Sequence, residues 1–382
     1  MKVNLSEAVG DACFVFRGYN NTNLGKTPEL LANPLYGPIV EKYLREASRI
    51  ASDETGNTID LVSRVRERRE TSLSTFPDAV ALILATEVAQ IELLKQFHSI
   101  DYSKARLAAG YSLGEIAANI CGGVMSFASA LSIPVALAND CAELGADTQM
   151  GIVFSRTGEI SAEQIERLCV EITLEGEGTL AISAYLSPNT MLLLGQGNTL
   201  DRFAEMRRKR LDKNIHFRKN PHRWPPLHTP IVRQRSVTDR ASTRLQKLGD
   251  RLQSPVPPIA SLVTGKINYN DYNAREILND WTDHPQRVWN AVCDTLSSGV
   301  RVVIHAGPEP NLFPATYKRL ADNVKGQHGG SAATNIGRRL VSGMIDRPWL
   351  ASLLPSQASL LRAPSLIHIT LEDWLLKHVP SR

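Results

Sequence analysis

Residues 105–121 read ARLAAGYSLGEIAANIC, and the GYSLG at 110–114 decides the fold. A short apolar run precedes it, and a helical pattern starts at Leu113. This matches G-x-S-x-G, in which a serine lies on a tight turn between a strand and a helix, so the residues two away must be small. The helix N-terminus then favours negative charge at the reacting centre. The stretch predicts a nucleophile, Ser112, although a plain glycine-flanked turn remains an alternative.

A nucleophilic serine needs a base, and His228 is the best candidate. It lies in PPLHTP at 225–230, where prolines on both sides restrict the backbone and hold one rotatable side chain on a rigid loop. Such a loop suits a base that must reach a serine far away in the sequence. A surface histidine without a catalytic role remains the competing interpretation.

The segments around GYSLG alternate between apolar strand and helix patterns. Strands are expected at 12–16 and 300–308, a strongly apolar helix at 77–97, and another helix at 126–146 that Pro134 interrupts. This alternation is typical of an α/β fold.

The pattern changes near residue 150. A strand, a helix capped by Ser161, a strand pair around a Ser-Pro-Asn turn and a second helix follow one another. They predict a compact α+β insert at 151–219, after which the α/β pattern returns.

Composition and charge exclude several classes of protein. The 382 residues are 43% hydrophobic and 21% charged, which is ordinary for a globular chain and argues against disorder. The formal net charge of +4 is weak, but nine Lys or Arg lie between 202 and 223, opposed by Glu205 and Asp212 alone. This run is either a solvated face or a docking patch for an acidic partner, and its few aromatic residues argue against nucleic acid.

The cysteines and apolar runs set the expected environment. Five cysteines form no CxxC pair, which indicates a reduced cytoplasmic protein without a disulfide framework, and no metal site is expected. No apolar stretch reaches 18 residues, so no membrane span is expected. The GKT at 25–27 resembles the end of a phosphate-binding loop, but the spacing of its glycines does not match that motif. A nucleotide triphosphate site is therefore not expected.

Taken together, these motifs resemble the malonyl-CoA:acyl-carrier-protein transacylase family and the acyltransferase domains of polyketide synthases. The order of six motifs over about residues 10–325 carries the resemblance, and residues 326–382 are not covered. In chain order they are FVFRGYNNTNLG, FPDAVALILATEVAQIELL, AGYSLGEIAAN, AISAYLSPNTMLLLGQG, PPLHTPIV and VVIHAGPEPNL.

The resemblance implies an α/β fold with an α/β-hydrolase-like large subdomain and an inserted ferredoxin-like α+β subdomain. The large subdomain would comprise 1–150 and 220–325, the insert 151–219, and a C-terminal extension 326–382.

It also implies an acyltransferase of fatty acid or polyketide biosynthesis. Ser112 would take an acyl group from a CoA or carrier-protein thioester, with His228 as general base and the backbone N–H groups of Leu113 and Tyr19 as the oxyanion hole. The phosphopantetheine thiol of an acyl carrier protein would then receive the acyl group, without a bound cofactor. Docking of that carrier is expected at Arg207, Arg208 and Arg210.

Three departures from the family bear on the substrate, and Tyr111, Asn20 and Leu137 are expected to contact it. Tyr111 replaces a histidine, the loop containing Asn20 replaces a Gln-Gly-Ser-Gln loop, and Leu137 replaces the arginine that pairs with a malonyl carboxylate. We therefore expect a neutral acyl group, unless Arg17 or Arg106 substitutes for that arginine. A carrier-protein thioester hydrolase on the same scaffold is the alternative function, and a catalytically weak docking protein is a third.

Overall fold

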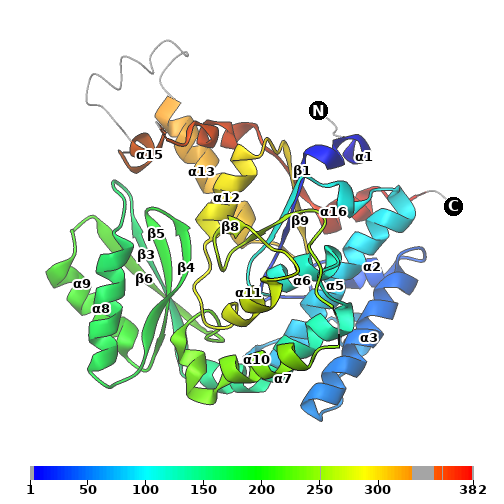
Figure 1. The fold of residues 1–382 in the computed structure, drawn as a ribbon, viewed down its shortest axis with the longest axis horizontal. Coiled ribbons are helices and arrows are strands. Elements are labelled where there is room, and N and C mark those ends of the chain that lie inside the picture. The colour runs from blue at the N-terminus through cyan, green and yellow to red at the C-terminus, as the bar shows by residue number, and fades with distance from the viewer. Residues whose placement is uncertain (1–3, 250, 329–347, 355, 381–382) are drawn as a thin grey trace.

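The computed structural model describes residues 4–249, 251–328, 348–354 and 356–380, and Figure 1 shows two sheets with their covering helices. The larger sheet has six strands in the order β10-β9-β1-β2-β7-β8, of which the first five are parallel and β8 is antiparallel to β7. Their bounds are β1 Ala12–Phe16, β2 Leu107–Gly110, β7 Ile259–Ser261, β8 Lys266–Ile267, β9 Val302–Ala306 and β10 Ile367–Thr370.

Helices cover both faces of this sheet, which explains why β1 is apolar throughout. Phe14 and Phe16 pack into one buried cluster, and Cys13 and Val15 pack into another on the opposite face. The helices are α1 Leu5–Ala8, α2 Thr27–Ala32, α3 Gly37–Thr55, α4 Leu61–Arg66, α5 Phe76–His98, α6 Leu113–Cys121, α7 Phe127–Gly145, α10 Val237–Lys247, α11 Ala274–Asp280, α12 Val288–Ser297, α13 Leu312–His328, α15 Pro348–Leu353 and α16 Leu371–Lys377.

The predicted interruption of the helix at 126–146 is wrong. Helix α7 runs through Pro134 without a break. Proline removes one hydrogen bond and strains a helix by about 3 kcal/mol. Because α7 buries an apolar face against α3 and α5, including Leu131 and Leu137, packing offsets that cost.

The second sheet is antiparallel, with the order β4-β5-β3-β6, and has α8 and α9 on its outer face (Figure 1). The chain passes through β3, α8, β4, β5, α9 and β6, which is the ferredoxin-like succession. The fold class predicted from the sequence is therefore confirmed. The elements are β3 Thr148–Ser155, α8 Ala162–Leu174, β4 Leu180–Ser187, β5 Thr190–Gln196, α9 Thr199–Arg210 and β6 Ile215–Arg223.

Strand β6 departs from the prediction, in which the insert ends with its second helix. Its sequence, IHFRKNPHR, shows little of the apolar alternation that marks a strand. It pairs with β3 at the edge of the sheet, with Phe217 opposite Val153. Charged residues and proline are typical of edge strands, because they discourage pairing with other chains.

The C-terminal segment completes the larger sheet. Strand β10 pairs in parallel with β9, and α16 follows it as the short helix expected from LEDWLLKHV. The Glu372 carboxylate of α16 accepts hydrogen bonds from the backbone N–H groups of Lys26 and Glu309, at 2.8 and 3.0 Å. The Gly/Ser/Ala-rich stretch of the predicted extension lies mostly at 329–347, outside the described residues.

Candidate functional site

Ser112 lies on the turn between β2 and α6, at the carboxyl end of the central parallel strands. Its backbone is strained, with φ 56° and ψ −119°. A Cβ on Gly110 would come within 2.0 Å of the carbonyl carbon of Gly114, and a Cβ on Gly114 within 2.4 Å of the Phe16 oxygen. Both glycines of the motif are therefore required for the strand, the turn and the helix to approach this closely.

The structure brings Ser112 and His228 together across 116 residues of sequence. Ser112 Oγ lies 2.7 Å from His228 Nε2, and His228 Nδ1 lies 2.8 Å from the Trp281 carbonyl oxygen. The backbone N–H of His228 donates to the Thr282 carbonyl at 2.8 Å, and the residue adopts a left-handed φ of 68°. The imidazole is thus fixed at its ring and its backbone.

The environment of His228 keeps its ring neutral. Burial lowers the pKa of His228 to about 4, although the hydrogen bond to Trp281 and the charge of Asp283 act in the opposite direction. Because a carbonyl accepts from Nδ1–H, the Nε2 lone pair is free to accept the Ser112 hydroxyl proton. The Asp283 carboxylate pairs with Arg233 and His284, so the Nδ1 atom of His228 has a backbone carbonyl, and not a carboxylate, as its partner.

Tyr19 and Leu113 flank Ser112 from two different loops. Leu113 is the first residue of α6. Gly18 lies so close to the turn that a Cβ there would be 2.7 Å from the Tyr111 oxygen and 3.0 Å from Ser112 Cβ. This approach sets the Tyr19 segment against the serine, and both predicted oxyanion-hole residues line the same cavity as Ser112 and His228.

The cavity at Ser112 is small and uncharged. Its volume is about 20 Å³, enough for about one water-sized group. Ser112 and His228 are 7% and 4% exposed. Among the described residues that line it there is no Lys or Arg, and its apolar walls are Phe76, Leu113, Leu194, Pro225 and Leu227.

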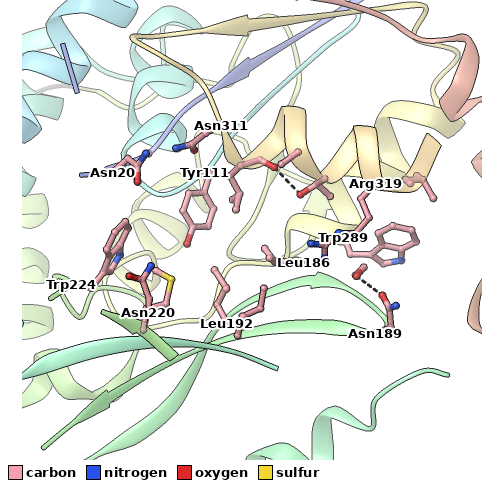
Figure 2. Close-up of a pocket in the computed structure, with 18 of the residues that line it drawn as sticks. Asn20, Tyr111, Leu186, Asn189, Leu192, Asn220, Trp224, Trp289, Asn311 and Arg319 are labelled. Carbon is pink, nitrogen blue, oxygen red and sulfur yellow. Dashed lines mark hydrogen bonds between the residues drawn. The ribbon is translucent and has the colours of Figure 1, made fainter. Parts of the chain in front are cut away.

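A larger pocket of about 330 Å³ adjoins this cavity (Figure 2). Tyr19, Tyr111 and Trp224 line both spaces, so Tyr111 stands where they meet. Asn20 also lines the larger pocket, which continues between the β4–β5 hairpin and α13 towards Arg319. Tyr111 and Asn20, both expected to contact substrate, therefore lie at its entrance to the serine.

Leu137 is not brought to the site. It is 1% exposed in the main core, because α7 turns its apolar face towards α3 and α5, and it lines neither cavity. The Arg17 guanidinium is not free to pair with a substrate carboxylate. It donates hydrogen bonds to oxygens of Gly18, Thr22, Asn23 and Pro308.

Arg106 also lies away from the serine. It precedes β2, so the whole strand separates it from Ser112, and it pairs with Asp11 at 2.6 Å. Neither Arg17 nor Arg106 supplies the cation that this position lacks.

The predicted docking arginines lie on α9, on the outer face of the smaller sheet and away from α6, the helix that follows Ser112 (Figure 1). Arg210 pairs with Glu171, and Arg207 donates to the Ile215 carbonyl. Arg208 is exposed. Of the nine basic residues in this run, Arg202, Arg210 and Lys219 pair with carboxylates of the same subdomain.

Two residues that hold the serine were missed by sequence reasoning. Trp281 accepts from His228 through its backbone, and its Nε1–H donates to the Ser112 carbonyl at 2.9 Å. Gln286 Oε1 accepts the Ser112 backbone N–H at 3.2 Å, and its own backbone bonds to Ser183 of the insert. No local motif signals either residue. A backbone carbonyl such as that of Trp281 carries no sequence signature, and Gln286 lies 174 residues from Ser112 in the sequence.

Two further searches concern the residues that the structure describes. In that part of the chain, no three His, Cys, Asp or Glu side chains gather as metal ligands would. Within the same residues, no helix combines the length and apolarity needed to span a membrane.

Comparison with known proteins gives distant but extensive similarities, and no family model matches. The malonyl CoA-acyl carrier protein transacylase of Bacillus subtilis is 25% identical over 66% of this chain and 60% of that protein, so the match spans about three fifths of the relative. The Salmonella typhimurium protein of the same name is 24% identical over 81% of this chain and 93% of its own length. A solved complex of a type II polyketide synthase acyl-carrier protein with its malonyl-transacylase matches in fold, with a TM-score of 0.62 and 22% identity, over 80% of this chain and 92% of that one.

Proposed function

We propose, from the premise that the chain belongs to the malonyl-CoA:acyl-carrier-protein transacylase and polyketide synthase acyltransferase family, that this protein transfers acyl groups between thiols through Ser112. The donor is a CoA or carrier-protein thioester, and the acceptor is the phosphopantetheine thiol of an acyl carrier protein. The observation that carries the proposal is the 2.7 Å contact between Ser112 Oγ and a buried, neutral His228.

The first half of the reaction loads the serine. Ser112 Oγ attacks the thioester carbonyl while His228 Nε2 takes the hydroxyl proton. The backbone N–H groups of Leu113 and Tyr19 stabilise the resulting oxyanion. The carbon–sulfur bond then breaks, and the leaving thiolate takes the proton from His228, which leaves an acyl-serine and a free thiol.

The second half reverses these steps with another thiol. That thiol gives its proton to His228, its sulfur attacks the acyl-serine, and Ser112 regains the proton as the ester bond breaks. The low pKa of His228 supports both roles, because the ring is neutral when it must accept a proton and a ready donor once protonated.

For the acyl group, we infer that it is neutral and short. The cavity of about 20 Å³ with its apolar walls supports a group such as acetyl. A malonyl carboxylate would lose a charged hydrogen bond of about 1.5–3 kcal/mol, on the order of 10- to 150-fold in selection. Leu137 lies in the core, and the Arg17 guanidinium already donates to neighbouring oxygens. Among the described residues that line this cavity, no cation is therefore available to pair with a malonyl carboxylate.

An acyl carrier protein is the partner in this proposal. The solved complex of similar fold holds such a carrier, and the exposed Arg208 on α9 supports electrostatic attraction for an acidic one, with Arg207 and Arg210 beside it. Thioester hydrolysis is the competing outcome, in which water completes the cycle.

The test of transfer follows the fate of the acyl-enzyme. Load the protein with acetyl-CoA, remove excess donor, and add either buffer or a holo acyl carrier protein. We expect acetyl to stay on Ser112 in buffer and to move to the carrier thiol, with Ser112→Ala as the control that loads nothing. Prompt release of free acetate in both samples would replace transferase with hydrolase.

A further inference from the structure

A second cavity adjoins the pocket of about 330 Å³ at the end of that pocket away from Ser112. Its volume is about 410 Å³, and it shares lining residues with the pocket of about 330 Å³, namely Ile152, Asn189, Arg319, Asn323 and Trp349. Because they share these lining residues, the two spaces form one continuous groove. One end reaches the serine at Tyr111, and the other opens between β3, β6 and α13.

Three arginines from distant parts of the sequence line this far end. Arg156 follows β3, Arg218 lies on β6 and Arg319 lies on α13, and no Asp or Glu is among the described residues that line the cavity. Among those described residues, the side chains of Arg156 and Arg218 form no ion pair or hydrogen bond, and the Arg319 side chain has one long contact, 3.4 Å to Thr190 Oγ1.

Basic residues next to these arginines do have carboxylate partners, so the lack of counter-ions is specific to the cavity. The neighbouring Lys318 pairs with Asp322 at 3.1 Å, and Lys219, next to Arg218, pairs with Asp201 at 2.8 Å. Like charges that converge on one cavity repel unless an anion lies between them. Guanidinium groups match the geometry of phosphate oxygens, and Ser155 and Thr190 add neutral hydroxyl donors to the same walls.

We propose that this arginine-lined cavity binds the phosphate groups at the end of the pantetheine arm, while the arm lies in the groove and its thioester reaches Ser112. The inference rests on the proposed function. The groove suits such an arm: Asn20, Asn220 and Asn311 offer partners for its two amides, and Trp224 and Leu312 offer apolar surface for its methyl groups.

The phosphate could be carried by coenzyme A or by the phosphoserine of a carrier protein. Both present a phosphate ester at the same end of the arm. Coenzyme A adds a second phosphate in its diphosphate and a third on its ribose, so the two sources differ in charge. Acetyl-CoA, acetyl-dephospho-CoA, acetyl-pantetheine and acetylated carrier protein therefore form a series that separates them.

The test is a triple variant, Arg156→Gln with Arg218→Gln and Arg319→Gln, which removes the charges but keeps polar side chains. We expect its KM for acetyl-CoA to rise at least about 10-fold with little change in kcat, while acetyl-pantetheine is used as by the unmodified protein. The matched control is Arg167→Gln with Lys318→Gln, which removes exposed charges outside the cavity and should change neither KM.

Each outcome has a distinct meaning. An unchanged KM for acetyl-CoA, or an equal loss with acetyl-pantetheine, would overturn the phosphate site while leaving the acyl-serine chemistry intact. Failure of every thioester to load Ser112 in the unmodified protein would instead overturn the proposed function. Calorimetric titration with free coenzyme A and dephospho-CoA gives a second readout, since weakened binding in the triple variant is expected without any turnover.

Discussion

The two ends of the groove differ in size and charge. The Ser112 end measures about 20 Å³ and has apolar walls without a described Lys or Arg, whereas the far end measures about 410 Å³ and has three arginines without a described carboxylate. This difference supports the proposed division of the groove into a chemical end and an anion-binding end. Because no ionic partner touches the ring of His228, burial dominates its pKa, and the base is neutral at physiological pH.

The arginines themselves give a second contrast. Those of α9 are more numerous in the sequence, yet Arg202 and Arg210 are neutralised by Glu175 and Glu171. Those of the groove come from three separate segments and have no such counter-ion among the described residues. The position of the carboxylates, and not the number of cations, decides where an anion would be attracted.

Removal of the base should have the largest effect. His228→Ala leaves Ser112 without a proton acceptor, so we expect the rate of acyl-enzyme formation to fall about 10²- to 10⁴-fold. Rapid mixing followed by mass measurement gives that rate, and circular dichroism controls for folding. A fall of less than about tenfold in the rate of acyl-enzyme formation would mean that His228 is not the general base for Ser112.

The close packing behind the serine gives the next largest effect. In Gly110→Ala the new methyl carbon would meet the Gly114 backbone at 2.0 Å, and we expect a loss of about 3 kcal/mol in the free energy of unfolding. Gly10→Ala is the control, because nothing lies within 4 Å of its added Cβ. Equal stability of the two variants by urea denaturation would contradict the required approach of β2 and α6.

The pH dependence of stability follows from two buried histidines, His228 and His305. Burial lowers the pKa of His228 to about 4 and that of His305 to about 3, below the usual value near 6.5. As pH falls below 6.5 the unfolded chain binds these protons first, so stability is complete above 6.5 and declines towards pH 4.

The loading rate of Ser112 should be level from pH 6 to 8 for the same reason, since His228 stays neutral there. A pH–rate profile measured with acetyl-pantetheine, which carries no phosphate, isolates the base. A half-maximal rate near pH 6.5 would show that the pKa of His228 is not lowered.

Charge reversal on α9 should have the smallest effect. Arg207→Glu with Arg208→Glu and Arg210→Glu is expected to leave the KM for acetyl-CoA unchanged, because these side chains line neither the groove nor its far end. The KM for a carrier protein should rise a few-fold and its salt dependence should flatten. If the α9 variant raised the KM for acetyl-CoA more than the groove triple variant does, the arginines of α9, and not those of the groove, would be the anion-binding set.

The sequence predicted what local patterns encode. The GYSLG turn, the proline-framed His228 and the β3–β5 periodicity gave the fold class and the two side chains that meet at 2.7 Å. It missed β6, whose charged edge residues hide the strand pattern, and the Trp281 carbonyl, which any residue could supply. Position alone also placed Leu137 at the substrate, whereas packing of α7 holds it in the core.

The groove arginines were missed for a different reason. Arg156, Arg218 and Arg319 are scattered among the 43 basic residues of the chain, and tertiary folding alone brings them to one cavity. A count of charge along the sequence favoured the dense run on α9, where Glu171 of α8 and Glu175 at the end of that helix lie opposite.

The most direct test of the central claim is the mass of the intact protein after brief exposure to equal concentrations of acetyl-CoA and malonyl-CoA. Acyl transfer of a neutral group through Ser112 predicts that the acetyl adduct predominates by about tenfold or more, and that Ser112→Ala carries neither adduct. A predominant malonyl adduct, or an acetyl adduct that persists in Ser112→Ala, would contradict it.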